Sequence, residues 1–182
     1  MTNQINILFY KTPYGELIIG SLDDQLCLCD WRYRNKRQAV DRRLQRLLKA
    51  EFVESGSQLI DEMVEQLEQF FIAKRTVFDI PLLFAGTPFQ KAVWQHLLKI
   101  PYGQTTTYAE LSESLGNRNA IRAVASANGA NALSIIVPCH RVIGSSGELT
   151  GYAGGLKAKE GLLRLENPEY QNNVAKQQLN LL

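Results

Sequence analysis

The sequence predicts an α+β protein in which a small antiparallel sheet with helices precedes a mostly helical part. Three short strand-like segments, separated by turn signals, open the chain. A helix start follows directly after Ala85-Gly86, and beyond it apolar residues recur with helical spacing. We therefore predict one domain over residues 1–85, a second over 86–167, and a tail over 168–182.

The composition is that of an ordinary globular chain, because 45% of the 182 residues are hydrophobic and 21% are charged. No run of 18 apolar residues exists, so we expect no transmembrane helix and no membrane association. The first residues lack a basic segment ahead of an apolar stretch, so we expect no signal peptide. The ordinary composition also makes a disulfide scaffold unlikely, and without a signal peptide we expect a cytoplasmic location, where thiols stay reduced.

The first 33 residues predict a strand meander, with the turn Thr12-Pro13-Tyr14-Gly15 between its first two strands. The predicted strands cover residues 5–10, 16–21 and 26–33. In the third strand, alternation places four residues on one face, namely Cys27, Cys29, Trp31 and Tyr33. We interpret both cysteines as small buried hydrophobic residues on that face.

A basic stretch follows, with eight Lys and Arg and a single acid between Arg32 and Lys49. Its apolar spacing predicts an amphipathic helix whose buried stripe consists of Val40, Leu44, Leu47 and Leu48. We favour a solvated helix with a core stripe over the alternative, a secondary contact to DNA phosphates. A second amphipathic helix is predicted over residues 59–71, and residues 76–84, interrupted by Pro81, suit an edge or a linker.

Capping boxes mark two helix starts in the second part. Thr87-Pro88-Phe89-Gln90 predicts a helix that stops before Pro101, and Thr107-Tyr108-Ala109-Glu110 predicts a short helix over 108–115. With a third helix over 119–128, capped by Asn119, the lengths fit a helix-turn-helix. The third helix is rich in small residues, which suits close approach either to a narrow DNA groove or to a packing partner.

A cysteine stands at the end of the apolar run Ser134-Ile135-Ile136-Val137-Pro138, which we predict to be a strand. Pro138 lacks an N–H and so ends strand pairing just before Cys139. A thiol is a poor nucleophile at neutral pH unless a base or a positive field lowers its pKa. His140 follows directly, but adjacent strand residues point to opposite sides, so proton transfer needs a bridging water or a local turn. The alternative is a buried core cysteine without chemistry.

Two further features accompany the thiol. Residues 143–155 form a glycine-rich loop with Tyr152 near its end, which suits either the close approach of a flat ligand or a mobile hairpin. Glu166 closes the last helix, where a carboxylate opposes the macrodipole, and His140 is the attractive partner for it. The cysteines lack the paired spacing of a metal site, so we expect no metal and no cofactor.

Together these motifs resemble those of the O6-alkylguanine-DNA alkyltransferases, or methylated-DNA–protein-cysteine methyltransferases, of the constitutive bacterial type. The motifs that carry the resemblance are Ile100-Pro-Tyr-Gly103, Thr107-Tyr108, Arg122-Ala-Val124, Asn131, Pro138-Cys-His-Arg-Val142, Gly151-Tyr-Ala-Gly-Gly-Leu156 and Lys159-Glu160. They cover residues 86–167 densely and residues 1–85 loosely. The resemblance implies a ribonuclease H-like N-terminal domain and a C-terminal domain with a helix-turn-helix.

The resemblance implies DNA repair by direct damage reversal. Cys139 would accept a methyl or other alkyl group from O6 of guanine, irreversibly and once per molecule. His140 would act as the base through a water molecule and be polarised by Glu166, while Tyr108 would donate to guanine N3. The sequence leaves open the range of alkyl groups and whether O4-alkylthymine also reacts.

The implied partner is double-stranded DNA, bound through its minor groove by a monomer, with the target nucleotide flipped out of the stack. Arg122 would fill the gap in the stack, and the implied DNA-contacting residues are Tyr108, Arg122, Ala123 and Ala127. The implied pocket for the flipped guanine is lined by Asn131, Val142, Tyr152 and Ala153. Asn131 would also brace the turn before the cysteine, and the Ala153 N–H would point at O6.

Some relatives differ from this chain in ways that limit what the resemblance implies. Ala153 replaces a serine of some relatives, so only the backbone donor remains there. No histidine precedes His96, so we do not expect the N-terminal zinc site of some relatives, nor do we expect the regulatory domain of the inducible ones. Two alternative functions stay open, a non-catalytic helix-turn-helix module that binds damaged DNA and a cysteine hydrolase that uses Cys139 and His140.

Overall fold

Strand residues of the first third form one four-stranded sheet in the computed structural model, which describes residues 3–170. The strands are β1 (Asn3–Thr12), β2 (Gly15–Leu22), β3 (Gln25–Trp31) and β4 (Ala50–Glu54), in the order β3-β2-β1-β4. The three predicted antiparallel strands are confirmed. β4 pairs parallel to β1. Its five residues are too few for an alternation of apolar and polar side chains to predict a strand. Most of the predicted tail, residues 171–182, lies outside the described residues.

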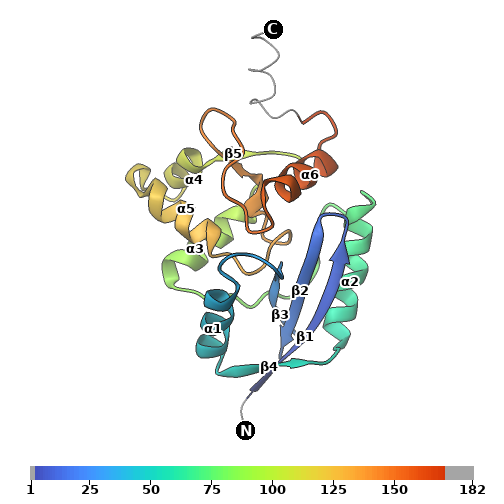
Figure 1. Ribbon diagram of the computed structural model, residues 1–182. Helices are drawn as coiled ribbons and strands as arrows, with labels where there is room; N and C mark the ends of the chain where they lie inside the picture. The colour runs from blue at the N-terminus through green and yellow to red at the C-terminus, as the bar shows by residue number, and fades with distance from the viewer. Residues whose placement is uncertain (1–2, 171–182) are drawn as a thin grey trace.

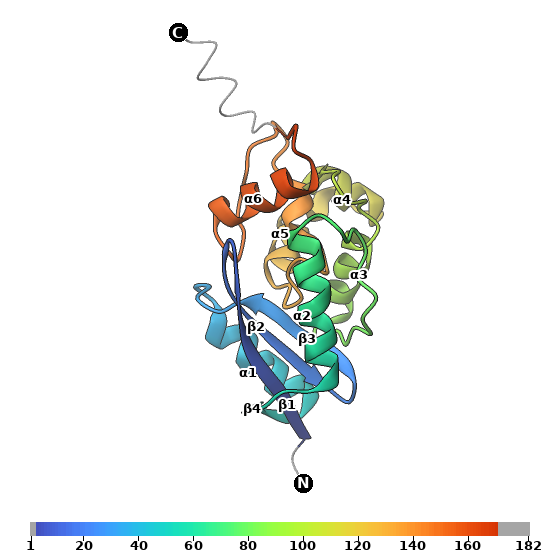
Figure 2. The same cartoon turned by 90° about the vertical axis from the view of Figure 1, so that its right-hand side faces the viewer.

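Each face of this sheet is covered by one amphipathic helix (Figures 1 and 2). α1 (Arg37–Leu48) buries Val40 and Leu44 against one face. Leu47, which we predicted in the same buried stripe, lies in the last turn of α1 and is 41% exposed. α2 (Gln58–Phe71) buries its apolar stripe against the other face, and Ser57 caps it by accepting a hydrogen bond from the Ile60 N–H at 3.2 Å.

A β-bulge breaks the alternation predicted for β3. The pairing with β2 shifts register after Gly20, so Cys27 faces the α1 side of the sheet. Cys29 and Trp31 face the α2 side, whereas Tyr33 lies beyond the strand and is 77% exposed. The predicted common face is therefore wrong at Cys27, where one inserted residue shifts the side-chain pattern, and at Tyr33, because the strand ends at Trp31. Both cysteines are buried free thiols, as their interpretation as core residues requires.

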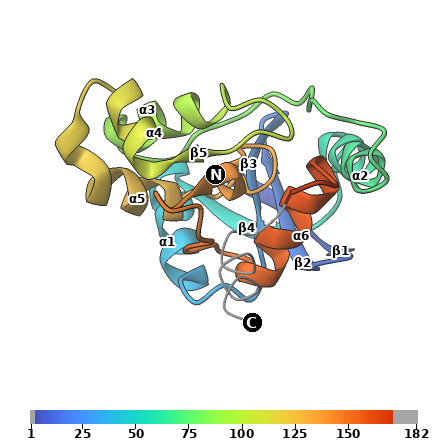
Figure 3. The same ribbon diagram turned by 90° about the horizontal axis from the view of Figure 1, so that it is seen from above.

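The helices of the C-terminal part are α3 (Pro88–Leu97), α4 (Tyr108–Ser114), α5 (Ile121–Gly129) and α6 (Leu156–Glu166). Both predicted capping boxes are present, at Thr87 and Thr107. A 3₁₀ turn, η1 (Arg118–Ala120), precedes α5, and Asn117 rather than Asn119 caps this turn. α4 and α5 pack against each other as the predicted helix-turn-helix, and α5 also packs against α3 (Figure 3). No helix among residues 3–170 is long and apolar enough to cross a membrane.

The edge of β3 joins the two parts of the chain. Leu82 forms a parallel bridge with Leu26, as expected for an edge segment, and Leu133 forms another with Cys29. In the second bridge the Cys29 N–H donates to the Ala132 carbonyl at 2.8 Å. β5 (Thr106–Thr107) and β6 (Val142–Ile143) form a separate parallel pair. The segment that carries Cys139 is thus tied to the N-terminal sheet before the thiol and to residues 106–107 after it.

Candidate active site

Cys139 begins a tight turn instead of ending a strand. It opens a second 3₁₀ turn, η2 (Cys139–Arg141), whose three side chains are buried. Pro138, with φ −80° and ψ 61°, is the centre of an inverse γ-turn in which the Cys139 N–H donates to the Val137 carbonyl at 2.8 Å. The strand predicted before Pro138 is wrong, because Ile135 has a positive φ of 76° that strand residues do not adopt.

The turn changes the relation between the thiol and the histidine. A β-branched residue at positive φ costs about 1–3 kcal/mol of conformational free energy. An isoleucine at position 135 therefore gives no indication, from the sequence, that the chain turns there. Successive residues in a 3₁₀ turn point about 120° apart rather than to opposite sides. The structure therefore supplies a local turn at Cys139 and His140, one of the two arrangements that proton transfer between them requires.

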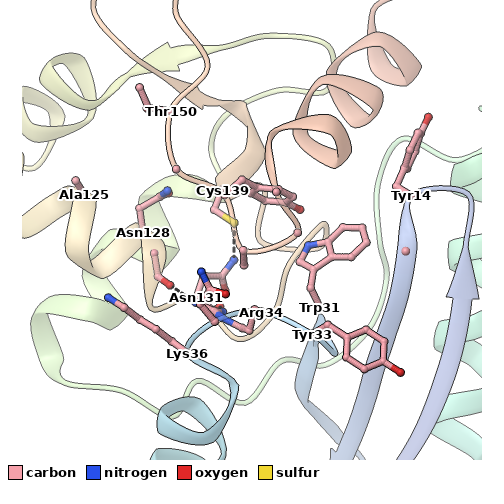
Figure 4. A pocket seen from close by; sticks show the side chains of 18 of the residues that line it. Tyr14, Trp31, Tyr33, Arg34, Lys36, Ala125, Asn128, Asn131, Cys139 and Thr150 are labelled. Carbon is pink, nitrogen blue, oxygen red and sulfur yellow. Dashed lines mark hydrogen bonds between the residues drawn. The ribbon is translucent and has the colours of Figure 1, made fainter.

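Asn131 holds the cysteine turn at two points (Figure 4). Its Nδ2 donates to the Val137 carbonyl at 2.9 Å and to Cys139 Sγ at 3.2 Å. Its Oδ1 accepts from the Leu133 N–H at 2.9 Å. The side chain thus braces the turn and also gives the sulfur a hydrogen-bond donor, which favours the thiolate form.

The thiol is protonated in the resting site. Burial raises the pKa of Cys139, and the Asp30 carboxylate adds to this increase. The Asn131 hydrogen bond and the positive charges of Lys159 and Arg34 lower the pKa again, but they do not cancel the effect of burial. Nucleophilic attack by this sulfur therefore requires a base that takes the proton.

Glu166, the last residue of α6, is a buried carboxylate with three partners. Its Oε1 lies 2.8 Å from His140 Nε2, and Arg141 donates to Oε2 and Oε1 at 2.8 and 2.9 Å. The Gly103 N–H donates to Oε2 at 3.2 Å. Burial by itself raises the pKa of Glu166, but His140 and Arg141 outweigh burial and lower the pKa to about 2. The carboxylate is therefore ionised and can only accept hydrogen bonds.

His140 is fully buried and neutral at pH 7, because burial lowers its pKa in spite of the Glu166 carboxylate. Since the ionised carboxylate only accepts, His140 Nε2 carries the ring proton. Nδ1 is then an unprotonated acceptor, and it makes no hydrogen bond with any described residue. The residue next to Cys139 thus offers one buried basic nitrogen that is free to take a proton.

A cavity of about 710 Å³ opens beside Cys139, between the two parts of the chain (Figure 4). Its volume suits a small organic ligand. Five of the predicted site residues line it, namely Tyr108, Asn131, Cys139, Tyr152 and Ala153. Val142 does not line it, because its side chain is buried elsewhere, and its carbonyl accepts from Lys159 Nζ at 2.5 Å.

The N-terminal part supplies a wall of this cavity that the motifs did not indicate. Trp31 is buried, and its ring meets that of Tyr152 edge to face at a centroid distance of 5.9 Å. Gly154 lies so close to the indole that a Cβ there would be 2.4 Å from it, so only glycine fits. The Tyr14 hydroxyl donates to the Gly161 carbonyl at 3.1 Å and attaches the β1–β2 turn to α6. These contacts are purely tertiary, so no spacing within the sequence predicts them.

The predicted DNA-contacting residues of α5 do not share one face. Arg122 and Ala123 are exposed. Ala127 is 3% exposed and lies in the core with Val124, and its carbonyl accepts from Trp94 Nε1 at 2.9 Å. The methyl group of Ala127 is therefore absent from the surface that Arg122 and Ala123 present, because it falls on the buried stripe of the helix.

Several arginines of the basic stretch around α1 form ion pairs and hydrogen bonds within the protein. Arg34 and Arg37 pair with the buried Asp30 carboxylate at 2.7 and 2.9 Å. Arg43 donates to the Ala130 carbonyl at 2.8 Å, and Arg32 pairs with Glu16 at 2.7 Å. These four arginines thus have structural partners. A contact to DNA phosphates stays a hypothesis for the remaining basic residues, Lys36, Arg42, Arg46 and Lys49.

Comparisons with known proteins agree with one another. Residues 88–168 match the family model described as 6-O-methylguanine DNA methyltransferase, DNA binding domain. A methylated-DNA–protein-cysteine methyltransferase of Methanosarcina barkeri is 42% identical over 164 residues, which cover 90% of this chain and 96% of that protein. Its namesake of Methanosarcina acetivorans is 54% identical over 157 residues, 86% of this chain and 95% of that protein. The crystal structure of Mycobacterium tuberculosis OGT in complex with DNA matches with a TM-score of 0.75 at 35% identity, over 94% of this chain and 97% of that chain.

Proposed function

The chain belongs to the methylated-DNA–protein-cysteine methyltransferase family, and from this premise we propose which of its residues carry out the reaction. The protein is a DNA-repair transferase that reverses damage directly, by moving an alkyl group from O6 of guanine in DNA to a cysteine. We propose Cys139 as the acceptor. The observation that carries this choice is the position of Cys139 in the wall of the large cavity, with a donor at Sγ and a free histidine nitrogen in the next residue. The other two cysteines, Cys27 and Cys29, are buried free thiols that do not line this cavity.

In this proposal the thiol proton leaves through His140. One water molecule carries it from Sγ to Nδ1, the ring nitrogen that the Glu166 contact leaves free. The imidazolium that forms is stabilised by the Glu166 carboxylate, which Arg141 holds with two hydrogen bonds. Glu166 therefore orients the base and neutralises its charge without taking the proton itself.

The thiolate then displaces guanine from its alkyl group. A bond forms between Sγ and the alkyl carbon while the bond from that carbon to O6 breaks, and the electron pair stays with the purine. The imidazolium gives up the thiol proton through water and the purine takes up one proton, so the products are neutral guanine, S-alkylcysteine and neutral His140. Because a thioether is stable, each molecule reacts once.

Three groups of the cavity wall would bind the purine. Burial raises the pKa of Tyr108, so its hydroxyl keeps its proton and can donate to guanine N3. The Ala153 N–H would donate to O6, where negative charge develops as the bond breaks. Tyr152 would line one side of the base. These contacts stabilise the leaving group in the same step in which the thiolate attacks.

A guanine inside a duplex cannot reach this cavity, so we propose that the target nucleotide is flipped out of the stack. α5 would enter the minor groove, because its exposed face carries small side chains next to Arg122. Arg122 would occupy the gap left in the stack, and Ala123 would allow the close approach. Ala127 has no part in this surface, since it is buried.

The proposal needs one copy of the chain and a reducing compartment. Every group named above comes from a single chain, which favours a monomer on DNA. The acceptor thiol must stay reduced until it reacts, which favours the cytoplasm. We keep the division into domains over 1–85 and 86–167 as part of the proposal, because the cavity lies where these two parts meet.

Intact-protein mass spectrometry after incubation with a duplex that carries one O6-methylguanine tests the acceptor. We expect one added methylene, mapped to the Cys139 peptide, with guanine restored and no second turnover. Cys139→Ser should gain no mass and still bind the duplex, whereas Cys27→Ser should react like the wild type. A label on another cysteine would overturn the assignment. Binding without a label would indicate the non-catalytic module, and repeated turnover with an unchanged thiol would indicate a hydrolase.

Arg122→Ala tests nucleotide flipping. If Arg122 fills the stack, its loss should slow repair of duplex DNA far more than alkylation by the free base O6-benzylguanine, which needs no flipping. Single-turnover rates on both substrates give the comparison. Equal losses on the two substrates would rule out a stack-filling role.

A further inference from the structure

Arg34, in the loop after β3, connects the N-terminal sheet to the end of α5. Its Nη1 donates to Asp30 Oδ2 at 2.7 Å and to the Asn131 carbonyl at 3.0 Å, and its Nη2 donates to the Gly129 carbonyl at 2.5 Å. The Arg34 side chain is nearly buried, and Asp30 is fully buried. One planar guanidinium thus joins a carboxylate of the sheet to two carbonyls at the end of the helix, a geometry that suits arginine and not lysine.

The residue that Arg34 holds is the one that contacts the sulfur. The Asn131 carbonyl accepts a hydrogen bond from Arg34, and the Asn131 side-chain amide donates to Cys139 Sγ at 3.2 Å. Figure 4 shows Asn131 between Arg34 and Cys139. The same Asp30 carboxylate also holds Ser134, three residues after Asn131, because the Ser134 hydroxyl donates to Asp30 Oδ1 at 3.0 Å. The sheet side therefore holds the chain at Gly129, Asn131 and Ser134, just before the segment that leads to the thiol.

We infer that Arg34 is a positioning residue for alkyl transfer, which sets the place of the Asn131 amide at the Cys139 sulfur. It belongs to the basic stretch of the N-terminal part, outside every motif of the C-terminal part. Its role is therefore to hold the thiol environment from the sheet side, and it acts through Asn131. The inference rests on the proposed role of Cys139 as acceptor.

Arg34 can be changed without leaving Asp30 alone. Arg37 Nη1, at 2.9 Å, and the Ser134 hydroxyl remain bound to the carboxylate. A lysine at position 34 keeps a positive charge in the same place, but a single ammonium cannot reproduce the three contacts of the fork. Arg34→Lys therefore separates the positioning of Asn131 from the neutralisation of Asp30.

The test measures single-turnover alkylation of the full chain by free O6-benzylguanine over a range of concentrations, together with thermal unfolding. For Arg34→Lys we expect the limiting rate to fall about tenfold, because small displacements near reacting atoms have effects of this size or larger. The half-saturating concentration should stay unchanged. Arg46→Lys, the same substitution at an exposed position of α1, is the matched control and should keep the wild-type rate. A change in half-saturating concentration with an unchanged limiting rate would overturn the inference.

A double-mutant cycle tests whether the effect passes through Asn131. If it does, Arg34→Lys should lower the rate no further in an Asn131→Ala background, because the amide that it positions is gone. If the double variant shows the product of the two single-variant losses in limiting rate, Arg34 does not act through Asn131. Asn131→Ser replaces Asn131→Ala if the alanine variant does not fold.

The inference and the proposed function fail in distinguishable ways. If the wild type is alkylated neither by O6-benzylguanine nor by the methylated duplex, the proposed function is wrong. If the wild type reacts and Arg34→Lys reacts at the same limiting rate, the proposed function stands and the role of Arg34 is wrong.

Discussion

Two buried carboxylates, Asp30 and Glu166, organise this protein in different ways. Each is paired with two basic side chains, and neither carboxylate is exposed. Asp30 binds two arginines and a serine, whose charges do not change near neutral pH. Glu166 binds one arginine and one histidine, and a histidine can gain and lose a proton in this range.

In the proposed mechanism, this difference separates a cluster that fixes a position from one that would move a proton. Permanent cations around Asp30 hold the end of α5 and the turn at residues 129–134 against β3. The neutral imidazole on Glu166 is held in one tautomer, which leaves its other nitrogen free to act as a base. The same carboxylate chemistry would therefore serve structure at Asp30 and, in the proposed mechanism, proton transfer at Glu166, because Glu166 has a histidine partner that can titrate.

His140→Gln tests the reactive cluster and has the largest expected effect. Glutamine can donate to Glu166, but it cannot accept a proton as a base. We expect the alkylation rate at neutral pH to fall by about 10²–10⁴-fold, with little change in the unfolding temperature. His96→Gln is the matched control, since His96 lies on α3 and contacts the Ala92 carbonyl at 3.0 Å. A His140→Gln protein that reacts at the wild-type rate would mean that another group is the base.

Asp30→Ala tests the structural cluster and should act on stability. It leaves Arg34 and Arg37 without their buried counter-charge, so we expect a loss of about 3–5 kcal/mol in the free energy of unfolding. Asp41→Ala removes the other, partly exposed partner of Arg37 and should cost about 1 kcal/mol or less. Denaturant unfolding of both variants makes the comparison. Similar losses in the two would show that the cluster at Asp30 is no more than an ordinary ion pair.

The pH dependence of stability gives the smallest effect and concerns Glu166. Its pKa is about 2 in the folded protein against an ordinary value of 4.5, so the unfolded chain takes up the proton more readily. The resulting stabilisation, about 3 kcal/mol, is complete above pH 4.5 and is lost as the pH falls towards 2. Urea unfolding of the wild type and of Glu166→Gln between pH 7 and pH 3 should show a steeper decline in the wild type. Parallel curves would mean that Glu166 is not held as an ionised partner of His140 and Arg141.

Much of the fold follows from local sequence patterns. The capping boxes at Thr87 and Thr107 fix the starts of α3 and α4, because each satisfies free backbone N–H groups with residues three positions apart. Strand alternation predicts β1 to β3 but misses β4, which is short, and the bulge at Cys27, which depends on pairing with β2. Local patterns thus predict elements well and departures from them poorly.

The candidate site divides in the same way. The sequence indicates Cys139, His140 and Glu166 together, because a thiol beside a histidine and a carboxylate at an unfavourable helix end each need partners. It gives no indication of the turn at Ile135, since a β-branched residue at positive φ persists only where surrounding packing imposes it. It also gives no indication that Trp31 and Arg34 belong to the site.

By itself, the sequence determined the chemical groups of the candidate site, the starts of α3 and α4 and the family to which the chain belongs. Only the tertiary structure decided that the cysteine lies in a tight turn, that Ala127 is buried, and that the N-terminal sheet holds the thiol segment through Asp30 and Arg34. The physical reason is the range of the interactions. Capping, alternation and adjacency act within a few residues, whereas a buried ion cluster joins residues about a hundred positions apart and forms only when the whole chain has folded.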